Sequence, residues 1–164
     1  MNANIDKIID AVVSDFYNKK DTSPLRTRKC ITLEVARKLI RKVEEKAAEM
    51  GVKAVVAIAD LSGRIIAVEC MDDSYIASYD VAVNKAFTCV SLKMSTKTLS
   101  TLSQPGQPLY GIQFTNNGKI VIFGGGEPLM VDGEVVGALG VSGGSEPQDT
   151  ELAAFGKAEF EKMI

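Results

Sequence analysis

The chain has 164 residues, of which 46% are apolar and 24% charged, and its formal net charge is −2. This length and composition are typical of a globular domain with a hydrophobic core, and the charge argues against a dedicated nucleic-acid surface, which would be basic. The sequence contains no histidine. One chain therefore cannot build a His-ligated haem, a zincin site or a histidine-containing catalytic triad.

The three cysteines, Cys30, Cys70 and Cys89, are widely spaced and form neither a disulfide framework nor a metal clip. The longest apolar run, 54–59, is far shorter than the roughly 20 residues of a membrane-spanning helix. The first ten residues also lack the pattern of a signal peptide. We therefore expect a cytoplasmic protein with reduced thiols, no metal site and no membrane partner.

The first element in the chain is an amphipathic helix over residues 4–17. Its apolar side chains share one stripe with helical spacing: Ile5, Ile8, Ile9, Val12, Val13 and Phe16. A polar, proline-containing linker follows, which separates residues 1–30 from a domain over 31–164. So short a helix is not stable alone in water. Its stripe must dock on its own domain, on another subunit or on a different protein.

The domain over 31–164 is predicted to be of the α/β (α+β) class. Helices are expected over 33–50, over 78–92 and from near Pro147, with a short helix or turn over 95–103. Strands are expected over 54–60, 64–70, 120–123, 129–131 and 134–141. Because short turns such as Asp132-Gly133 join neighbouring strands, the sheet should be mainly antiparallel, with five strands and helices packed on it.

The connection over residues 105–118 is long, irregular and rich in Pro, Gly and Asn. Loops of this length inside a compact domain are often functional. The run Gly124-Gly125-Gly126-Glu127-Pro128 is expected to be a connection between strands. It would either line a pocket together with the 104–111 loop or act as a structural wide turn.

The corner Ser142-Gly143-Gly144-Ser145 leads from a strand into the Pro147 helix. Backbone N–H groups that glycines expose at a helix start form a natural site for a phosphate or carboxylate. The spacing is neither that of a Walker loop nor that of a dinucleotide fingerprint. The alternative is that these glycines permit tight turning and close packing.

Lys85 stands inside a helix that is apolar nearly all round. A desolvated lysine can have a lowered pKa and serve as a nucleophile or base. Alternatively, it snorkels to the surface or pairs with a carboxylate such as Asp60 or Asp149.

Four segments stand in a fixed order along the domain: ASYDVAVNKAFT (77–88), STKTLSTLSQPGQPLYG (95–111), GGGEPLMVDGEVVGALGVSGG (124–144) and EPQD (146–149). Together they resemble the GlcG/HbpS family, which includes the C-terminal domain of PduO-type proteins. The resemblance covers residues 32–164. It implies a profilin-like fold, a symmetric homo-oligomer and, in some members, haem binding.

The resemblance also implies an accessory, non-catalytic protein that binds a small ligand or cofactor of the haem or corrinoid type. Without histidine, the remaining axial ligands for haem are Met, Cys, Tyr and Lys. Two other functions stay open. One is an enzyme that acts on a small carboxylate or phosphate metabolite through Lys85 and the 142–145 corner. The other is an interaction protein that works through its N-terminal helix.

A short amphipathic helix followed by a flexible linker resembles the encapsulation peptides of bacterial microcompartment cargo, and the family's link to propanediol-type operons agrees with this. Its stripe would then bind a shell or core protein, and the protein would lie in the cytoplasm or in the microcompartment lumen. The alternative is a helix that packs on its own oligomer.

Overall fold

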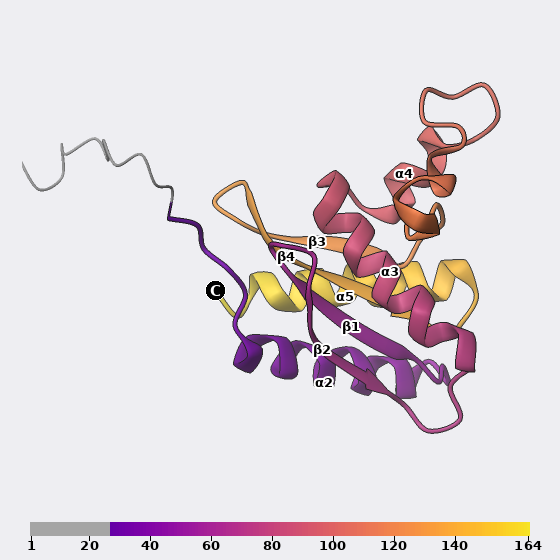
Figure 1. Cartoon of the computed structure of the whole chain (residues 1–164). Helices are drawn as coiled ribbons and strands as arrows, with labels where there is room; N and C mark the ends of the chain where they lie inside the picture. Colours follow the sequence, from indigo (N-terminus) through magenta and orange to yellow (C-terminus); the bar gives the residue numbers. More distant parts are fainter. Residues whose placement is uncertain (1–26) are drawn as a thin grey trace, which may run out of the picture.

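The computed structural model describes residues 27–164 (Figure 1). The predicted N-terminal helix, with its stripe from Ile5 to Phe16, lies outside the described residues. The elements are α2 (Leu33–Glu49), β1 (Val55–Asp60), β2 (Ile65–Cys70), α3 (Ile76–Leu92), α4 (Thr96–Leu102), the 3-10 turns η1 (Ile112–Phe114) and η2 (Asn116–Gly118), β3 (Gly126–Val131), β4 (Glu134–Ser142) and α5 (Glu146–Glu161).

The described residues form one antiparallel sheet of four strands in the order β2-β1-β4-β3. The antiparallel α/β class is confirmed, but the prediction of five strands was wrong, because residues 120–123 are not a strand. Ile120 and Val121 are buried, yet the Val121 N–H donates to the Thr88 hydroxyl at 3.0 Å instead of to a neighbouring strand. These residues are apolar because they are buried beside α3, and they do not pair with a strand. The profilin-like fold stays a prediction.

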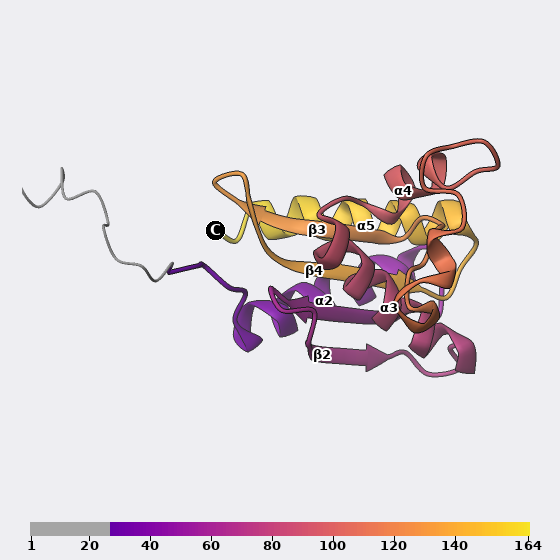
Figure 2. The same ribbon diagram turned by 45° about the horizontal axis from the view of Figure 1, so that its top comes forward.

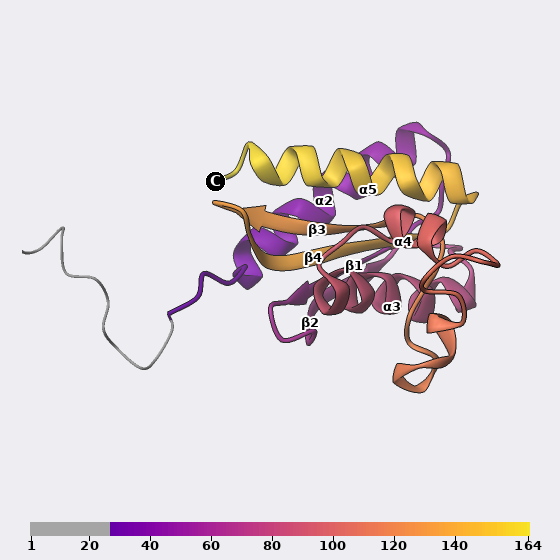
Figure 3. The ribbon, with the colours of Figure 1, turned by 90° about the horizontal axis from the view of Figure 1, so that it is seen from above.

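Helices cover the sheet on both faces, with α2 and α5 on one side and α3 on the other (Figures 2 and 3). Strand β1 is buried along its whole length because it faces both layers. Val56 and Ile58 belong to the core under α2 and α5, whereas Ala57 and Ala59 pack toward α3. None of the described helices has the length and apolar character needed to cross a membrane.

Local sequence signals explain most element boundaries. The Thr32 hydroxyl accepts the Val35 N–H at 3.3 Å and caps α2, and Gly51, at φ +68, follows its end. Asp132 and Gly133, at φ 51 and 78, form the predicted tight turn between β3 and β4.

Glycines at two sheet positions let α3 pack closely on the sheet. Gly126 pairs with Gly140 across β3 and β4. A side chain at position 140 would meet the Ala82 carbonyl oxygen, and a Cβ at position 126 would lie 2.8 Å from the Cys89 sulfur. The prediction that residues 124–128 form a connection between strands was wrong for the last three of them, which begin β3.

Candidate functional site

A fully buried ion pair lies where α3 meets the end of β4 and the start of α5. The Lys85 Nζ donates to Asp149 Oδ2 and to the Val141 carbonyl oxygen, each at 2.8 Å. The Phe123 ring covers the same ammonium group, with its centroid 5.0 Å away. Burial lowers the pKa of Lys85, and the Asp149 carboxylate opposes that shift. Of the two partners considered from sequence, Asp149 is the one found.

The triple glycine closes over this ion pair. A Cβ at Gly125 would lie 2.5 Å from Lys85 Nζ and 2.8 Å from the Val141 carbonyl oxygen, and Gly125 itself has φ +110. Its own carbonyl oxygen accepts the Val141 N–H at 2.8 Å. Only glycine allows the backbone to approach this closely. The neighbouring N–H groups of Gly124 and Gly126 donate to Glu146 and Thr96, at 3.2 and 2.9 Å.

The predicted anion corner already has an anionic partner from within the chain. The Gly144 N–H donates to Asp149 Oδ1 and the Ser145 N–H donates to Gln148 Oε1, both at 2.9 Å. Ser142 is buried, with its hydroxyl 3.2 Å from that of Ser78. Two of the donors expected to face an external phosphate are thus occupied.

The remaining predicted residues have structural partners too. Glu127 pairs with Lys157 of α5 at 3.4 Å, and burial raises the pKa of Glu127 while Lys157 opposes the shift. Asp60 holds the β1–β2 turn by accepting from Ser62 and Arg64. Lys85 has no exposed surface, so it cannot contact a substrate in this conformation. We call the set around Lys85, Asp149 and Gly125 the closed network.

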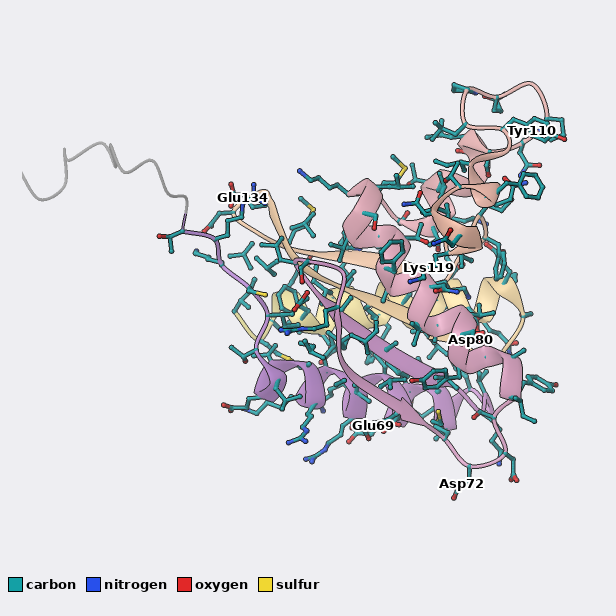
Figure 4. All side chains as sticks on the ribbon, viewed as in Figure 1. Glu69, Asp72, Asp80, Tyr110, Lys119 and Glu134 are labelled. Carbon is teal, nitrogen blue, oxygen red and sulfur yellow. The ribbon has the colours of Figure 1, made fainter. Side chains whose placement is uncertain are left out.

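An open cleft lies on the outer side of the same corner. Two adjoining hollows, of about 440 and 570 Å³, share the residues Gly51, Val52 and Lys53 between α2 and β1. The first hollow is bounded by Tyr75, Gln148 and residues 143–145. The second is bounded by the end of β2 and the turn after it, where Figure 4 labels Asp72. We call these two hollows together the Lys53 cleft.

The Lys53 cleft gathers four kinds of side chain that can bind iron. Besides Lys53 and Tyr75, it contains the exposed Cys70 and the thioether of Met71. The Met71 sulfur accepts the Ala54 N–H at 3.4 Å. Lys53 pairs with Asp73 at 3.1 Å, and both of these side chains are more than half exposed. Such an exposed pair is weak and can exchange partners.

Sequence reasoning missed the Lys53 cleft, apart from the corner at 143–145. Most of its residues come from three stretches that are far apart in sequence, 51–53, 70–75 and 143–148, and Glu44 and Ala48 of α2 complete the wall. Neither 51–53 nor 70–75 carries a motif. The predicted antiparallel pairing was the one usable signal. It brings the start of β1, the end of β2 and the end of β4 to the same end of the sheet.

Comparison with known proteins gives a consistent set of relatives. A family model described as "Haem degrading protein HbpS-like" matches residues 31–158. The 15.0 kDa protein in the dhaT-dhaS intergenic region of Citrobacter freundii is 45% identical over 75% of this chain and 87% of that protein. The corrinoid adenosyltransferase PduO of Salmonella typhimurium is 38% identical over 83% of this chain, but only 39% of PduO is covered. The solved PduOC:heme complex has a TM-score of 0.76, with 38% identity over 79% of this chain and 94% of that chain.

Proposed function

This chain belongs to the HbpS-like family, and from that premise we propose that it is an accessory protein that binds a small cofactor of the haem or corrinoid type. A related domain has been solved as a haem complex, and another relative is named a corrinoid adenosyltransferase. Since the chain spans less than half of PduO, no adenosyltransferase activity is carried over from it.

The donor set of the Lys53 cleft fits the ligation that a haem group needs. Thiolate, thioether and phenolate are all known haem ligands, and Cys70, Met71 and Tyr75 supply them here. Cys70 would be the residue to hold the iron, because its side chain is exposed whereas the Met71 sulfur already accepts a hydrogen bond. When bound, a haem supplies an iron that can carry an electron or a small molecule.

The surroundings of Cys70 fit a haem less completely. Ligand pockets usually bury most of a ligand surface among apolar side chains. The walls of the Lys53 cleft carry charged groups beside their apolar residues, among them Glu44, Lys53 and Asp72. Lys53 would bind a ligand carboxylate as a point charge.

One observation carries the proposal. The chain has no histidine, yet a cysteine, a methionine, a tyrosine and a lysine, which can all bind iron, line one open cleft. The family also has a member solved with haem bound. The test is a titration of the full-length protein with hemin, followed by absorbance. We expect a saturable Soret shift at one hemin per copy or per pair of copies. A featureless titration would remove haem as the ligand.

The N-terminal segment is the basis of a second proposal. The family match begins at residue 31, so residues 1–30 are an addition to the family domain. Their single apolar stripe supports the role of an encapsulation peptide that binds a microcompartment shell or core protein. Deleting residues 1–20 should leave the domain folded, with its oligomeric mass unchanged, but no longer localised to the microcompartment. Loss of the oligomer on deletion would instead place the helix inside the assembly.

A further inference from the structure

A hollow of about 350 Å³ lies beside the turn between β3 and β4. Its walls come from that turn, from the turn between β1 and β2, from the end of α3 and from Arg28. The β3–β4 turn and residue 27 lie at the left-hand end in Figure 1, and Figure 4 labels Glu134 there. We call this space the hairpin hollow, and it shares no residue with the Lys53 cleft.

The hairpin hollow has apolar walls that are incompletely covered. Four apolar side chains line it: Leu61, Val90, Met130 and Val135. Met130 is 38% exposed, and the other three are partly buried. Met130 and Val135 are cross-strand partners and therefore lie on one face of the sheet, while Val90 packs against the core under α3. That core thus continues to the surface here and stays partly open within the described residues.

The described chain begins along one wall of the hairpin hollow. The Ile31 N–H donates to the Val136 carbonyl oxygen at 2.9 Å, and the Lys29 ammonium pairs with Asp132 of the β3–β4 turn at 2.6 Å. These contacts place residues 29–31 beside the start of β4, and Arg28 lies in the wall itself. The chain that precedes Arg28 therefore starts from the edge of this hollow.

The predicted helix over 4–17 is tethered close to the hairpin hollow. Residues 18–27 connect it to Arg28 and span up to about 35 Å when extended. The apolar stripe from Ile5 to Phe16 is about 17 Å long in a helix. A tether of this length gives an effective concentration on the order of 1 mM, so even a weak contact keeps the two parts together.

The charges around the stripe and around the hairpin hollow are complementary. At helical spacing, Asp6 and Asp15 flank the apolar stripe on its two sides. The rim of the hollow carries the exposed Arg28 and Lys93, against one carboxylate, that of Glu134. A helix that places its stripe in the hollow would therefore bring its flanking carboxylates to a rim with an excess of positive charge.

We infer that the helix over 4–17 docks in the hairpin hollow of its own chain, with its stripe on the apolar walls and its flanking carboxylates toward Arg28 and Lys93. The docked helix would cover the same stripe that is proposed to bind a microcompartment protein. That partner would have to displace the helix, and its apparent affinity would fall in proportion to the undocked fraction. The docking rests on the hollow, the tether and the charges, and only this competition rests on the encapsulation role.

Disulfide trapping in the full-length protein tests the docking. Val12→Cys places a thiol on the stripe and Met130→Cys places one in the hollow, while Cys30→Ser and Cys70→Ser remove the two exposed native thiols. On mild oxidation we expect a disulfide within one chain, seen as the loss of two thiols at an unchanged chain mass under denaturing conditions. Lys7→Cys with Met130→Cys is the matched control, because position 7 lies opposite the stripe. Its disulfide should form at least tenfold more slowly.

Amide hydrogen exchange in residues 4–17, followed by mass spectrometry, gives a second readout. Met130→Asp should speed this exchange at least tenfold. Lys93→Gly should speed it at least threefold without lowering stability, because Lys93 ends α3 at φ 54, where glycine is the usual residue. Tyr110→Asp is the control and should change nothing, since Tyr110 is 64% exposed and lies far from Glu134 and the hollow in Figure 4.

Equal trapping rates at positions 7 and 12, or an exchange rate that neither hollow substitution changes, would overturn the docking. A disulfide that joins two chains would overturn it as well, because the hollow would then hold the helix of a second copy. Equal trapping rates, combined with lost localisation on deletion of residues 1–20, would leave the encapsulation role standing without the docking. Rapid trapping at position 12, combined with unchanged localisation after that deletion, would do the reverse.

Discussion

The closed network and the Lys53 cleft lie on the two sides of one corner, residues 143–145. They differ in whether the backbone of that corner contacts buried side chains or borders an open hollow. On the inner side, the Gly144 N–H donates to Asp149, which also holds the buried Lys85. On the outer side, Gly143, Gly144 and Ser145 border an open hollow beside Lys53. The comparison shows that the buried Lys85 and the glycines around it are engaged by partners within the chain, whereas most of the residues on the open side belong to no sequence motif.

The largest expected effect is the loss of Lys85. Lys85→Met leaves the Asp149 carboxylate buried without its ammonium partner, with only the Gly144 N–H still donating to it, which should lower the free energy of unfolding by about 3–5 kcal/mol. Urea denaturation measures it. Lys97→Met is the matched control, because the Lys97–Glu146 pair is more exposed and should cost about 1 kcal/mol or less.

The double variant Lys85→Met/Asp149→Leu sharpens the same point. It removes both charges and should recover most of the lost stability, because apolar replacements of a buried pair are often neutral. If Lys85→Met alone were as stable as the wild type, the ion pair would not be the structural centre of the closed network.

The next effect in size concerns the glycine over the ion pair. Gly125→Ala places a methyl group against Lys85 Nζ and the Val141 carbonyl oxygen at φ +110, and we expect a loss of about 3 kcal/mol. Gly106→Ala tests positive φ alone, because Gly106 has φ +82 and nothing within 4 Å of the added group. It should cost only about 1 kcal/mol. Equal losses in thermal or urea unfolding would mean that close packing at Gly125 is not the cause.

A smaller effect concerns the pH dependence of stability at Glu127. Burial raises the pKa of Glu127 above its ordinary 4.5, so in the window just above 4.5 the folded protein holds a proton that the unfolded chain releases. This contribution to stability is therefore present at low pH and declines as pH rises through the window. Glu127→Gln should flatten that decline.

Urea unfolding at a series of pH values measures this change. Lys157→Met should act in the opposite direction and steepen the decline, because it removes the ammonium group that lowers the pKa of Glu127. Identical profiles for wild type and Glu127→Gln would contradict the assignment.

The smallest effect on stability is expected in the Lys53 cleft. Lys53→Ala breaks an exposed ion pair with Asp73 and should change the free energy of unfolding by less than about 0.5 kcal/mol. It should nevertheless weaken binding of a carboxylate-bearing ligand, measured by titration. A stability loss as large as that of Lys85→Met would remove the distinction between the two regions.

Local signals were sufficient to predict much of the fold. The Asp132-Gly133 turn and the apolar run of β1 each depend on a few neighbouring residues, and both predictions were confirmed. The Thr32 cap of α2 is an equally local signal. The prediction of a strand over residues 120–123 was wrong. An apolar run indicates burial, but it does not indicate which groups form hydrogen bonds with its backbone.

The site was harder to predict for a different reason. Whether Lys85 is catalytic or paired depends on Asp149, which is 64 residues away, and whether a glycine run binds an anion depends on which side chain already fills it. The Lys53 cleft depends on three connections that meet only after the sheet forms. Contacts between residues so far apart in the chain produce no periodicity and no characteristic residue spacing in a single sequence.

The most direct test titrates hemin into two double variants. Lys53→Glu/Cys70→Ser alters the cleft, and Lys85→Met/Asp149→Leu alters the closed network. We predict that the cleft variant loses or shifts the Soret response while the network variant, once shown to be folded, keeps it. The opposite result, with binding lost only in the network variant, would contradict the account that the open side of the corner holds the ligand.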